Sequence, residues 1–203
     1  MEQTIEFIKE NHTYLVDGKK VPSITELIEL MIPSKYVGIP DLVLKNACEY
    51  GIQVHQEIDD YIKSKEELYK TIEARNVIKF IFPRYGIKPM LSEHIVAYKI
   101  NDLVVAMGTV DLIYRNKDNL FGIADYKTTS AFYEDMVEAQ LNLYAILCEQ
   151  SLKIDISELN CIRVHGDTRK IKSIEIKKTQ YLDFLNKALE KWNENQKSGK
   201  KWK

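Results

Sequence analysis

The sequence predicts one α/β domain, in which helices flank a central mixed β-sheet that contains an antiparallel meander. Apolar residues recur at helical spacing in several separate segments, and runs rich in Val, Ile and Tyr lie in the middle of the chain. The 203 residues include no low-complexity linker that would separate a second domain. The predicted order is helices, three strands, helix, two strands and helix, which indicates a sheet of mixed direction.

The chain begins with a predicted β-hairpin followed by a short helix. The segment TIEFIKENHTYLVDGKKV has two alternating apolar runs around a polar break. Ser23 is a good N-cap for the helix SITELIELM, and Glu26, three residues later, completes a capping box.

Two longer helices are expected next. Apolar residues keep a helical spacing over about 42–62, with Gly51 as an interruption. A further helix is expected over 66–82, ended by Pro83 and Gly86.

The second half of the chain carries the predicted sheet. Val, Ile and Tyr are enriched in its strands, and Asn-Asp and Asn-Lys-Asp-Asn turns separate the first three of them. The expected elements are strands at 92–100, 103–114 and 120–128, a helix at 133–150, strands at 159–165 and 171–176, and a helix at 180–196.

Composition excludes several classes of protein. The net charge of −1 argues against a protein that coats nucleic acid through bulk positive charge, and no apolar run is long enough to cross a membrane. The N-terminal segment does not resemble a signal or transit peptide, so we expect a cytoplasmic protein and no membrane partner. Cys48, Cys148 and Cys161 are too few and too scattered for a disulfide framework or a four-thiolate metal site.

The candidate chemistry lies in the segment GTVDLIYRNKDNLFGIADYKTTS. Asp125 and Lys127 are two residues apart on one predicted strand and therefore share a face, and Asp111 lies on the neighbouring strand. Two adjacent carboxylates repel each other, and Mg²⁺ or Mn²⁺, which prefers oxygen ligands, would remove that cost. The lysine could orient a water and stabilise a phosphate, and the carbonyl of Tyr126 could be a further ligand.

The alternative is that Asp125 and Lys127 form an exposed pair on a solvated strand, which is the usual meaning of an isolated D-x-K. Phe121, Ile123 and other apolar neighbours indicate a buried sheet instead, where an unpaired charge is costly.

Further polar residues occur in order around this centre. His55 lies on the predicted helix before it, where a lone histidine is more often structural than a ligand. Gln140 and Tyr144 are four residues apart, and hence on one face of the helix after it, where such a pair is usually surface or core rim.

Taken together, these motifs resemble the RecB-like branch of the PD-(D/E)XK nuclease superfamily, in particular its phage and prophage exonucleases. The resemblance covers residues 12 to about 150, and it includes a segment like HTYLVDGKKVPSITELI ahead of the histidine helix. The motifs are G-x-x-x-H (Gly51, His55), G-x-x-D (Gly108, Asp111), D-x-K (Asp125, Tyr126, Lys127) and Q-x-x-x-Y (Gln140, Tyr144).

The resemblance implies a single restriction-endonuclease-like domain over 1–203, with a hairpin and helices over about 1–90 and a catalytic α/β core over about 91–196. It implies a Mg²⁺ or Mn²⁺ ion and a set of roles. Metal ligands would be Asp111, Asp125, the Tyr126 carbonyl and His55, Lys127 would be the catalytic lysine, and Gln140 and Tyr144 would position groups in the site. Glu93 would be a carboxylate that supports the ligands or binds a second metal, and the alternative is a surface residue at the end of a strand.

The expected function is therefore metal-dependent hydrolysis of DNA, by an exonuclease rather than an endonuclease, in recombination, repair or phage genome processing. The sequence lacks the four cysteines that hold an iron–sulfur cluster in some relatives, and it lacks an ATP-binding G-x-x-x-x-G-K-[ST] loop. The expected cell is a bacterium or a phage-infected host, and the expected partner is DNA. A homo-oligomer or a recombination or replication protein could be a further partner.

Local positive charge could contribute to DNA binding. The candidate residues are Arg163, Arg169, Lys170 and Lys172. The competing interpretation of the whole chain is a non-catalytic DNA-binding or protein-interaction module on a nuclease fold, whose signature would be loss of a carboxylate or the lysine.

Overall fold

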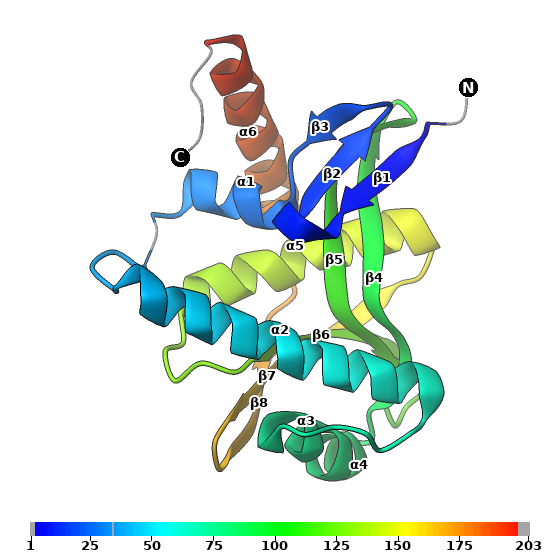
Figure 1. Cartoon of the computed structure of the whole chain (residues 1–203). Helices are drawn as coiled ribbons and strands as arrows, with labels where there is room; N and C mark the ends of the chain where they lie inside the picture. Colours follow the sequence, from blue (N-terminus) through cyan, green and yellow to red (C-terminus); the bar gives the residue numbers. More distant parts are fainter. Residues whose placement is uncertain (1–2, 34, 199–203) are drawn as a thin grey trace.

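The computed structural model describes residues 3–33 and 35–198 (Figure 1). Two sheets and a set of helices account for these residues. The strands are β1 (Ile5–Ile8), β2 (Thr13–Val16), β3 (Lys19–Val21), β4 (Lys88–Ile100), β5 (Leu103–Arg115), β6 (Phe121–Lys127), β7 (Ile156–His165) and β8 (Thr168–Ile174). The helices are α1 (Ile24–Met31), α2 (Asp41–Ser64), α3 (Ile72–Asn76), α4 (Phe82–Tyr85), α5 (Glu134–Leu152) and α6 (Lys178–Lys197), with a 3₁₀ turn η1 (Lys9–Asn11) and a π-helical turn η2 (Val77–Ile81).

The larger sheet has five strands in the order β4-β5-β6-β7-β8. β4, β5 and β6 form an antiparallel meander, β6 and β7 are parallel, and β7 and β8 are antiparallel. The prediction of an α/β protein with a mixed sheet and a meander is confirmed. β6 and β7 can be parallel because α5 connects the end of β6 to the start of β7.

The smaller sheet extends the predicted N-terminal hairpin by one strand. β1 and β2 pair as expected, and Lys19–Val21 adds β3 beside β2. The extra turn is made by Asp17 and Gly18, which both have positive φ (51° and 74°), as a two-residue β-hairpin turn requires.

Helix α1 begins as the sequence predicts. The Ser23 hydroxyl accepts from the Glu26 amide (3.1 Å), and the Glu26 carboxylate accepts from the Ser23 amide (2.9 Å), which completes the capping box. Helix α2 likewise covers the predicted segment, and its apolar stripe of Val54, Ile58 and Ile62 is buried.

The helix predicted over 66–82 begins too early and stops three residues short, although Gly86 ends the helical run as predicted, in the left-handed conformation (φ 65°). The Glu57 carboxylate accepts from the amides of Lys70 and Thr71 (3.0 and 2.8 Å), so a tertiary contact holds that segment out of a helix. Thr71 then caps α3, which begins at Ile72. Pro83 does not end the helical run, because it lies where the π-helical turn η2 passes directly into α4 and the regular hydrogen-bond pattern of an α-helix is already interrupted.

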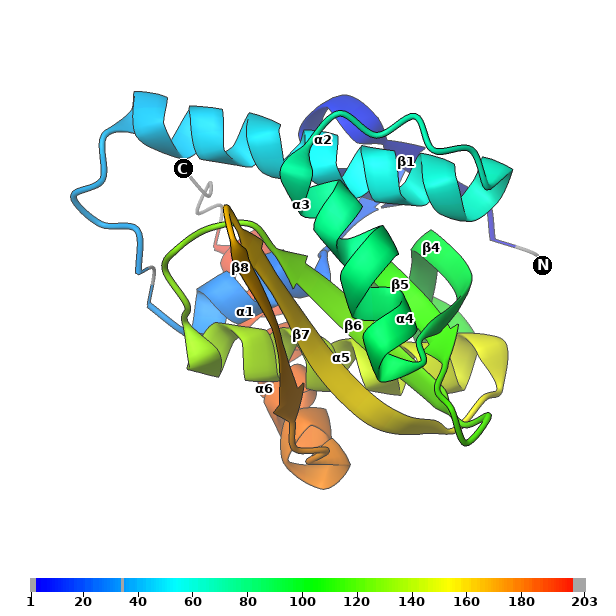
Figure 2. The same cartoon turned by 90° about the horizontal axis from the view of Figure 1, so that it is seen from below.

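Helices cover both faces of the five-stranded sheet (Figure 2). One apolar core joins a face of the sheet to α1, α5 and α6, and a second joins the opposite face to α2, α3 and η2. No helix within the described part of the chain has the length and apolar character needed to span a bilayer.

Candidate functional site

The candidate site lies where β5 and β6 separate, at a point that we call the fork. Their ladder runs from Arg115↔Phe121 to Leu112↔Ala124, and the next residues in that register are Asp111 and Asp125. The ladder stops there, and the Asp111 Oδ2 atom accepts a hydrogen bond from the Tyr126 amide at 2.9 Å. A side-chain carboxylate thus replaces a backbone acceptor, and both aspartates are buried.

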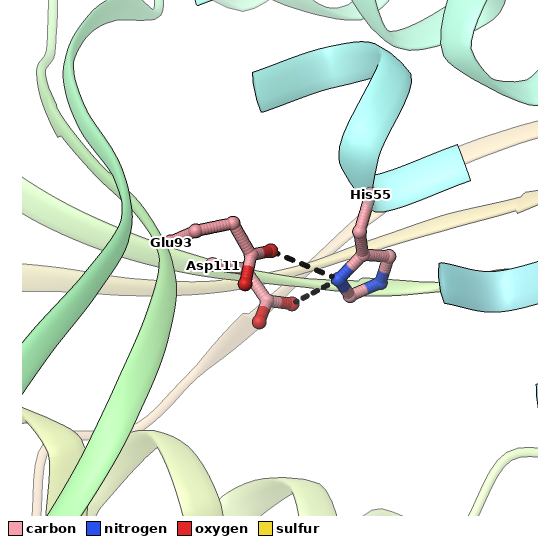
Figure 3. Close-up of side chains that lie close together, drawn as sticks. All are labelled: His55, Glu93 and Asp111. Carbon is pink, nitrogen blue, oxygen red and sulfur yellow. Dashed lines mark ion pairs between the residues drawn. The ribbon is translucent and has the colours of Figure 1, made fainter. Parts of the chain in front are cut away.

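A histidine and two carboxylates meet on one side of this fork (Figure 3). His55 Nδ1 lies 3.3 Å from Glu93 Oε1 and 3.6 Å from Asp111 Oδ2. One potential ligand atom from each of the three residues lies within 4.8 Å of the others. The other ring nitrogen, His55 Nε2, lies 3.3 Å from the Tyr126 carbonyl oxygen. Asp125, the other predicted carboxylate ligand, is not among the three residues of this cluster.

Glu93 occupies a strained position in β4. The flanking pairs Ser92↔Leu112 and His94↔Val110 place it opposite Asp111, and its φ is +45°. A non-glycine residue in this region is held there by its surroundings, and such strain concentrates at functional sites. The sequence indicated Glu93 only as a strand-start carboxylate, because nothing in the sequence reveals the backbone twist that aims it at His55.

The fork also holds the predicted lysine. Lys127 Nζ donates to Asp125 Oδ1 (2.9 Å) and to Gln140 Oε1 on α5 (3.2 Å). The second oxygen of Asp125 is buried and has no hydrogen-bond partner within the described residues. The fork therefore brings Asp125, Lys127 and Gln140 together, and the Oδ2 atom of Asp125 lacks a hydrogen-bond donor among the described residues.

Burial and mutual charge shift the pKa of each ionisable group in the fork. Burial raises the pKa of Asp125 to about 6, although Lys127 opposes this. Burial also raises the pKa of Asp111. Burial disfavours charged His55, but the neighbouring Asp111 and Glu93 outweigh it and raise the pKa of His55 to about 9. For Lys127 too, burial is outweighed by Asp125 and Asp111, and the pKa rises, so the side chain stays cationic.

Tyr144 is placed beneath the strand that carries Asp111. A Cβ atom on Gly108 would lie 2.5 Å from Tyr144 Cε1 and 3.3 Å from Ile24 Cγ1, so only glycine allows this approach. Tyr144 is buried, and burial raises the pKa of its hydroxyl far above the ordinary value. Its ring thus supports the backbone three residues before Asp111.

The four predicted DNA-binding cations do not form one patch. Arg163, Lys170 and Lys172 are on one face of the β7–β8 hairpin, since Arg163 pairs directly with Lys170. Arg169 is on the other face, with its guanidinium 4.2 Å from the centre of the Phe80 ring. Lys170 is exposed.

Two of these cations hold the segment between β6 and α5. Arg163 Nη2 donates to the Ser130 carbonyl (3.2 Å), and its guanidinium lies 4.6 Å from the centre of the Phe132 ring. Lys172 Nζ lies 2.6 Å from Glu134 Oε2. These four residues are close together in the sequence, which is why they were predicted to act together. In the structure they lie on two faces of the hairpin, and two of them are engaged in local contacts.

A pocket of about 210 Å³ opens beside Lys127. Its walls come from α1, from the segment after α1, from the segment between β6 and α5, and from the first turns of α5. Sequence reasoning missed it, because two of its walls are irregular segments without apolar periodicity.

Comparisons with known proteins leave the family open. No protein-family model matches the sequence, and no curated protein matches it. The solved crystal structure of SSO0001 is 12% identical with a TM-score of 0.43, over 83% of this chain and 75% of that one. A likeness at that level supports neither a fold family nor a function.

Proposed function

We propose that this protein is a metal-dependent DNA nuclease, most specifically an exonuclease, on a single restriction-endonuclease-like domain. The observation that carries the proposal is the fork of β5 and β6. There, two buried aspartates and a lysine converge beside a histidine and a glutamate. This arrangement agrees with the order of motifs in the sequence.

The residues present fit a hard divalent cation. Asp125 Oδ2 is a buried acceptor without a hydrogen-bond donor among the residues described, and the buried Glu93 Oε1 faces His55 Nδ1 at 3.3 Å. Carboxylate oxygens and a backbone carbonyl are ligands that suit Mg²⁺ or Mn²⁺, and the imidazole nitrogen favours the softer Mn²⁺ over Mg²⁺. Asp111, Asp125, the Tyr126 carbonyl and His55 would hold the ion, with Glu93 next to His55. When bound, such an ion acidifies a water molecule and offsets negative charge on a phosphate.

Lys127 supplies a fixed positive charge to the reaction. Its ammonium is held by Asp125 and Gln140, so its position is set before substrate arrives. Its raised pKa keeps it protonated, which suits it to donate hydrogen bonds to a phosphate oxygen or an attacking water, and not to act as a base.

Gln140 and Tyr144 act on this centre in different ways. Gln140 contacts the lysine directly and orients the ammonium. Tyr144 packs under Gly108 and supports the strand that carries Asp111. Both are positioning residues in this proposal.

The test is digestion of end-labelled linear DNA, single- and double-stranded, beside closed circular plasmid, in Mg²⁺, Mn²⁺ or EDTA. The critical variant is Lys127→Ala. Lys177→Ala is a matched control, because Lys177 is also half-buried (30% against 31% exposed) and ion-paired to a carboxylate at 2.8 Å.

Metal-dependent loss of linear DNA alone, abolished by Lys127→Ala and retained by Lys177→Ala, is the expected result. Cutting of circles would indicate an endonuclease. Equal cleavage by Lys127→Ala would remove the lysine from the site, and absence of cleavage by the folded wild-type protein would favour a non-catalytic DNA-binding module.

A further inference from the structure

The pocket beside Lys127 is lined by two chemically different kinds of group. One kind is polar and includes Lys127 and Gln140, the cation and the amide that border the proposed scissile phosphate. The other kind is aromatic and consists of the side chains of Tyr36, Phe132 and Tyr133. The α1 wall contributes Thr25 and Glu29, which offer further hydrogen-bonding groups.

Tyr36 and Tyr133 are held in place by contacts between the two segments that carry them. The Tyr133 hydroxyl donates to the Lys35 carbonyl (3.3 Å), and Lys35 Nζ lies 3.1 Å from Asp135 Oδ2. The Tyr36 and Tyr133 rings meet edge to face, with centroids 5.3 Å apart and planes at 90°. These contacts join the segment after α1 to the start of α5, so the rings are arranged before a ligand enters.

Size and charge define the ligand. At about 210 Å³, the pocket is smaller than the roughly 300–1,000 Å³ sites that hold drug-sized molecules, so it has room for one ring system. Lys127 is the only cationic side chain in its described lining, which argues against a site for a run of phosphates. A flat heterocycle joined to a phosphate that Lys127 contacts fits both features.

We propose that this pocket binds the unpaired base next to the scissile phosphate, so that the substrate is a single-stranded or frayed DNA end. The inference rests on the proposed nuclease function. A base inside a duplex is stacked and paired and must be extruded before it can enter such a pocket, whereas an unpaired base stacks on aromatic rings without that cost.

The experiment separates the base from its phosphate. Short, end-labelled single strands are prepared in which one nucleotide at a time is abasic, so that every phosphate is retained. Their affinities for the full chain are measured by fluorescence anisotropy with Ca²⁺ in place of Mg²⁺. One position, or two adjacent ones, should lose affinity by roughly 5- to 100-fold, the range expected for one stacked base.

Variants connect that loss to the pocket. In Tyr36→Ala, an abasic nucleotide at the position that matters for the wild-type protein should lower the affinity by less than about twofold. Tyr36→Phe should behave like the wild type, because the ring remains. Tyr85→Ala is the matched control, since Tyr85 is a tyrosine of the same exposed fraction (42%) on α4. It should keep the full abasic effect.

The outcomes distinguish the two proposals. The base pocket is overturned, even if DNA is cleaved, if no abasic position lowers the affinity of the wild-type protein. It is also overturned if the loss of affinity is as large in Tyr36→Ala as in the wild type. A Tyr36-dependent abasic effect without cleavage in Mg²⁺ keeps the pocket and overturns the nuclease. Failure to bind any strand overturns both.

Discussion

The β5–β6 strand pair carries a polar cluster near each end, and the two clusters are built in opposite ways. At the end where the pair is closed, the Tyr114 hydroxyl donates to Glu158 Oε1 (2.9 Å) and accepts from Asn160 Nδ2 (2.6 Å). Asn116 Nδ2 donates to the other oxygen of Glu158 (2.6 Å). Both oxygens of this carboxylate therefore have donors.

At the fork, by contrast, carboxylate oxygens exceed donors. Asp125 Oδ2 is buried and lacks a hydrogen-bond partner among residues 3–33 and 35–198, and Glu93 Oε1 and Asp111 Oδ2 share His55 Nδ1, at 3.3 and 3.6 Å. A buried acceptor without a partner costs about 1–3 kcal/mol, and the positive φ of Glu93 adds strain. The closed end has the features of a stabilising network. The unpaired oxygen and the backbone strain at the fork cost folding free energy, as is expected of a site that binds a ligand.

The largest expected difference between the two ends is in cleavage. Replacing Asp125 with Asn should slow digestion of linear DNA at least about a thousandfold, since the proposed metal contributes several kcal/mol and each 1.4 kcal/mol is a factor of ten. Glu158→Gln, the same acid-to-amide change at the closed end, should leave the rate within about twofold. The measurement is the initial rate in Mg²⁺, with folding checked by circular dichroism.

Either of two results would break the comparison. If Asp125→Asn cleaves at the wild-type rate, the fork is not the catalytic centre. If Glu158→Gln loses cleavage while folded, the closed end takes part in function and the two ends are not separate.

The sequence predicts the fork better than its surroundings. Asp111 can approach Asp125 if their two strands pair as a hairpin, and the observed register of that hairpin leads to these two residues. Lys127 follows from the same alternation. Their meeting with Gln140 depends on where α5 packs, which no local pattern encodes.

Errors arose where distant contacts override local preference. Residues 66–71 have helical character, but the Glu57 carboxylate holds the amides of Lys70 and Thr71. The grouping of Arg169 with Arg163 failed for a different reason, because sequence proximity ignores the two faces of a strand. The Tyr36–Tyr133 contact joins two irregular segments and leaves no periodic signal.

Metal binding should stabilise the fork and have no counterpart at the closed end. At a Mn²⁺ concentration about 100 times its Kd, linkage predicts about 2.7 kcal/mol of stabilisation, or roughly 5–10 °C in Tm for a chain of this size. Asp111→Asn should lose most of this shift, and Glu158→Gln should retain it. Differential scanning fluorimetry with and without Mn²⁺ measures both. An undiminished shift in Asp111→Asn would place the ion elsewhere.

Two glycines offer a smaller and more symmetrical test. A Cβ on Gly108 would lie 2.5 Å from a Tyr144 ring atom, and a Cβ on Gly122 would lie 2.5 Å from Tyr114 Cζ. Each Gly→Ala change should therefore cost about 1–3 kcal/mol in the free energy of unfolding, measured by urea denaturation. Only Gly108→Ala should also slow cleavage, because Tyr144 supports the strand of Asp111. Loss of activity in Gly122→Ala at a temperature where it is folded would contradict this.

The smallest expected effect compares two buried hydroxyls. The Tyr114 hydroxyl has two hydrogen-bond partners, whereas the Tyr126 hydroxyl has none in the described part of the chain. Tyr114→Phe should therefore cost about 1 kcal/mol, or roughly 2–4 °C in Tm. Tyr126→Phe should leave Tm unchanged or raise it slightly, because it removes an unpaired polar group from the interior. Cleavage should persist in Tyr126→Phe, since the main-chain carbonyl of this residue borders His55 and is retained. An equal loss of Tm in both variants would mean that the Tyr126 hydroxyl is paired in solution, by a buried water for example. The fork would then lack one of the features that distinguish it from the closed end.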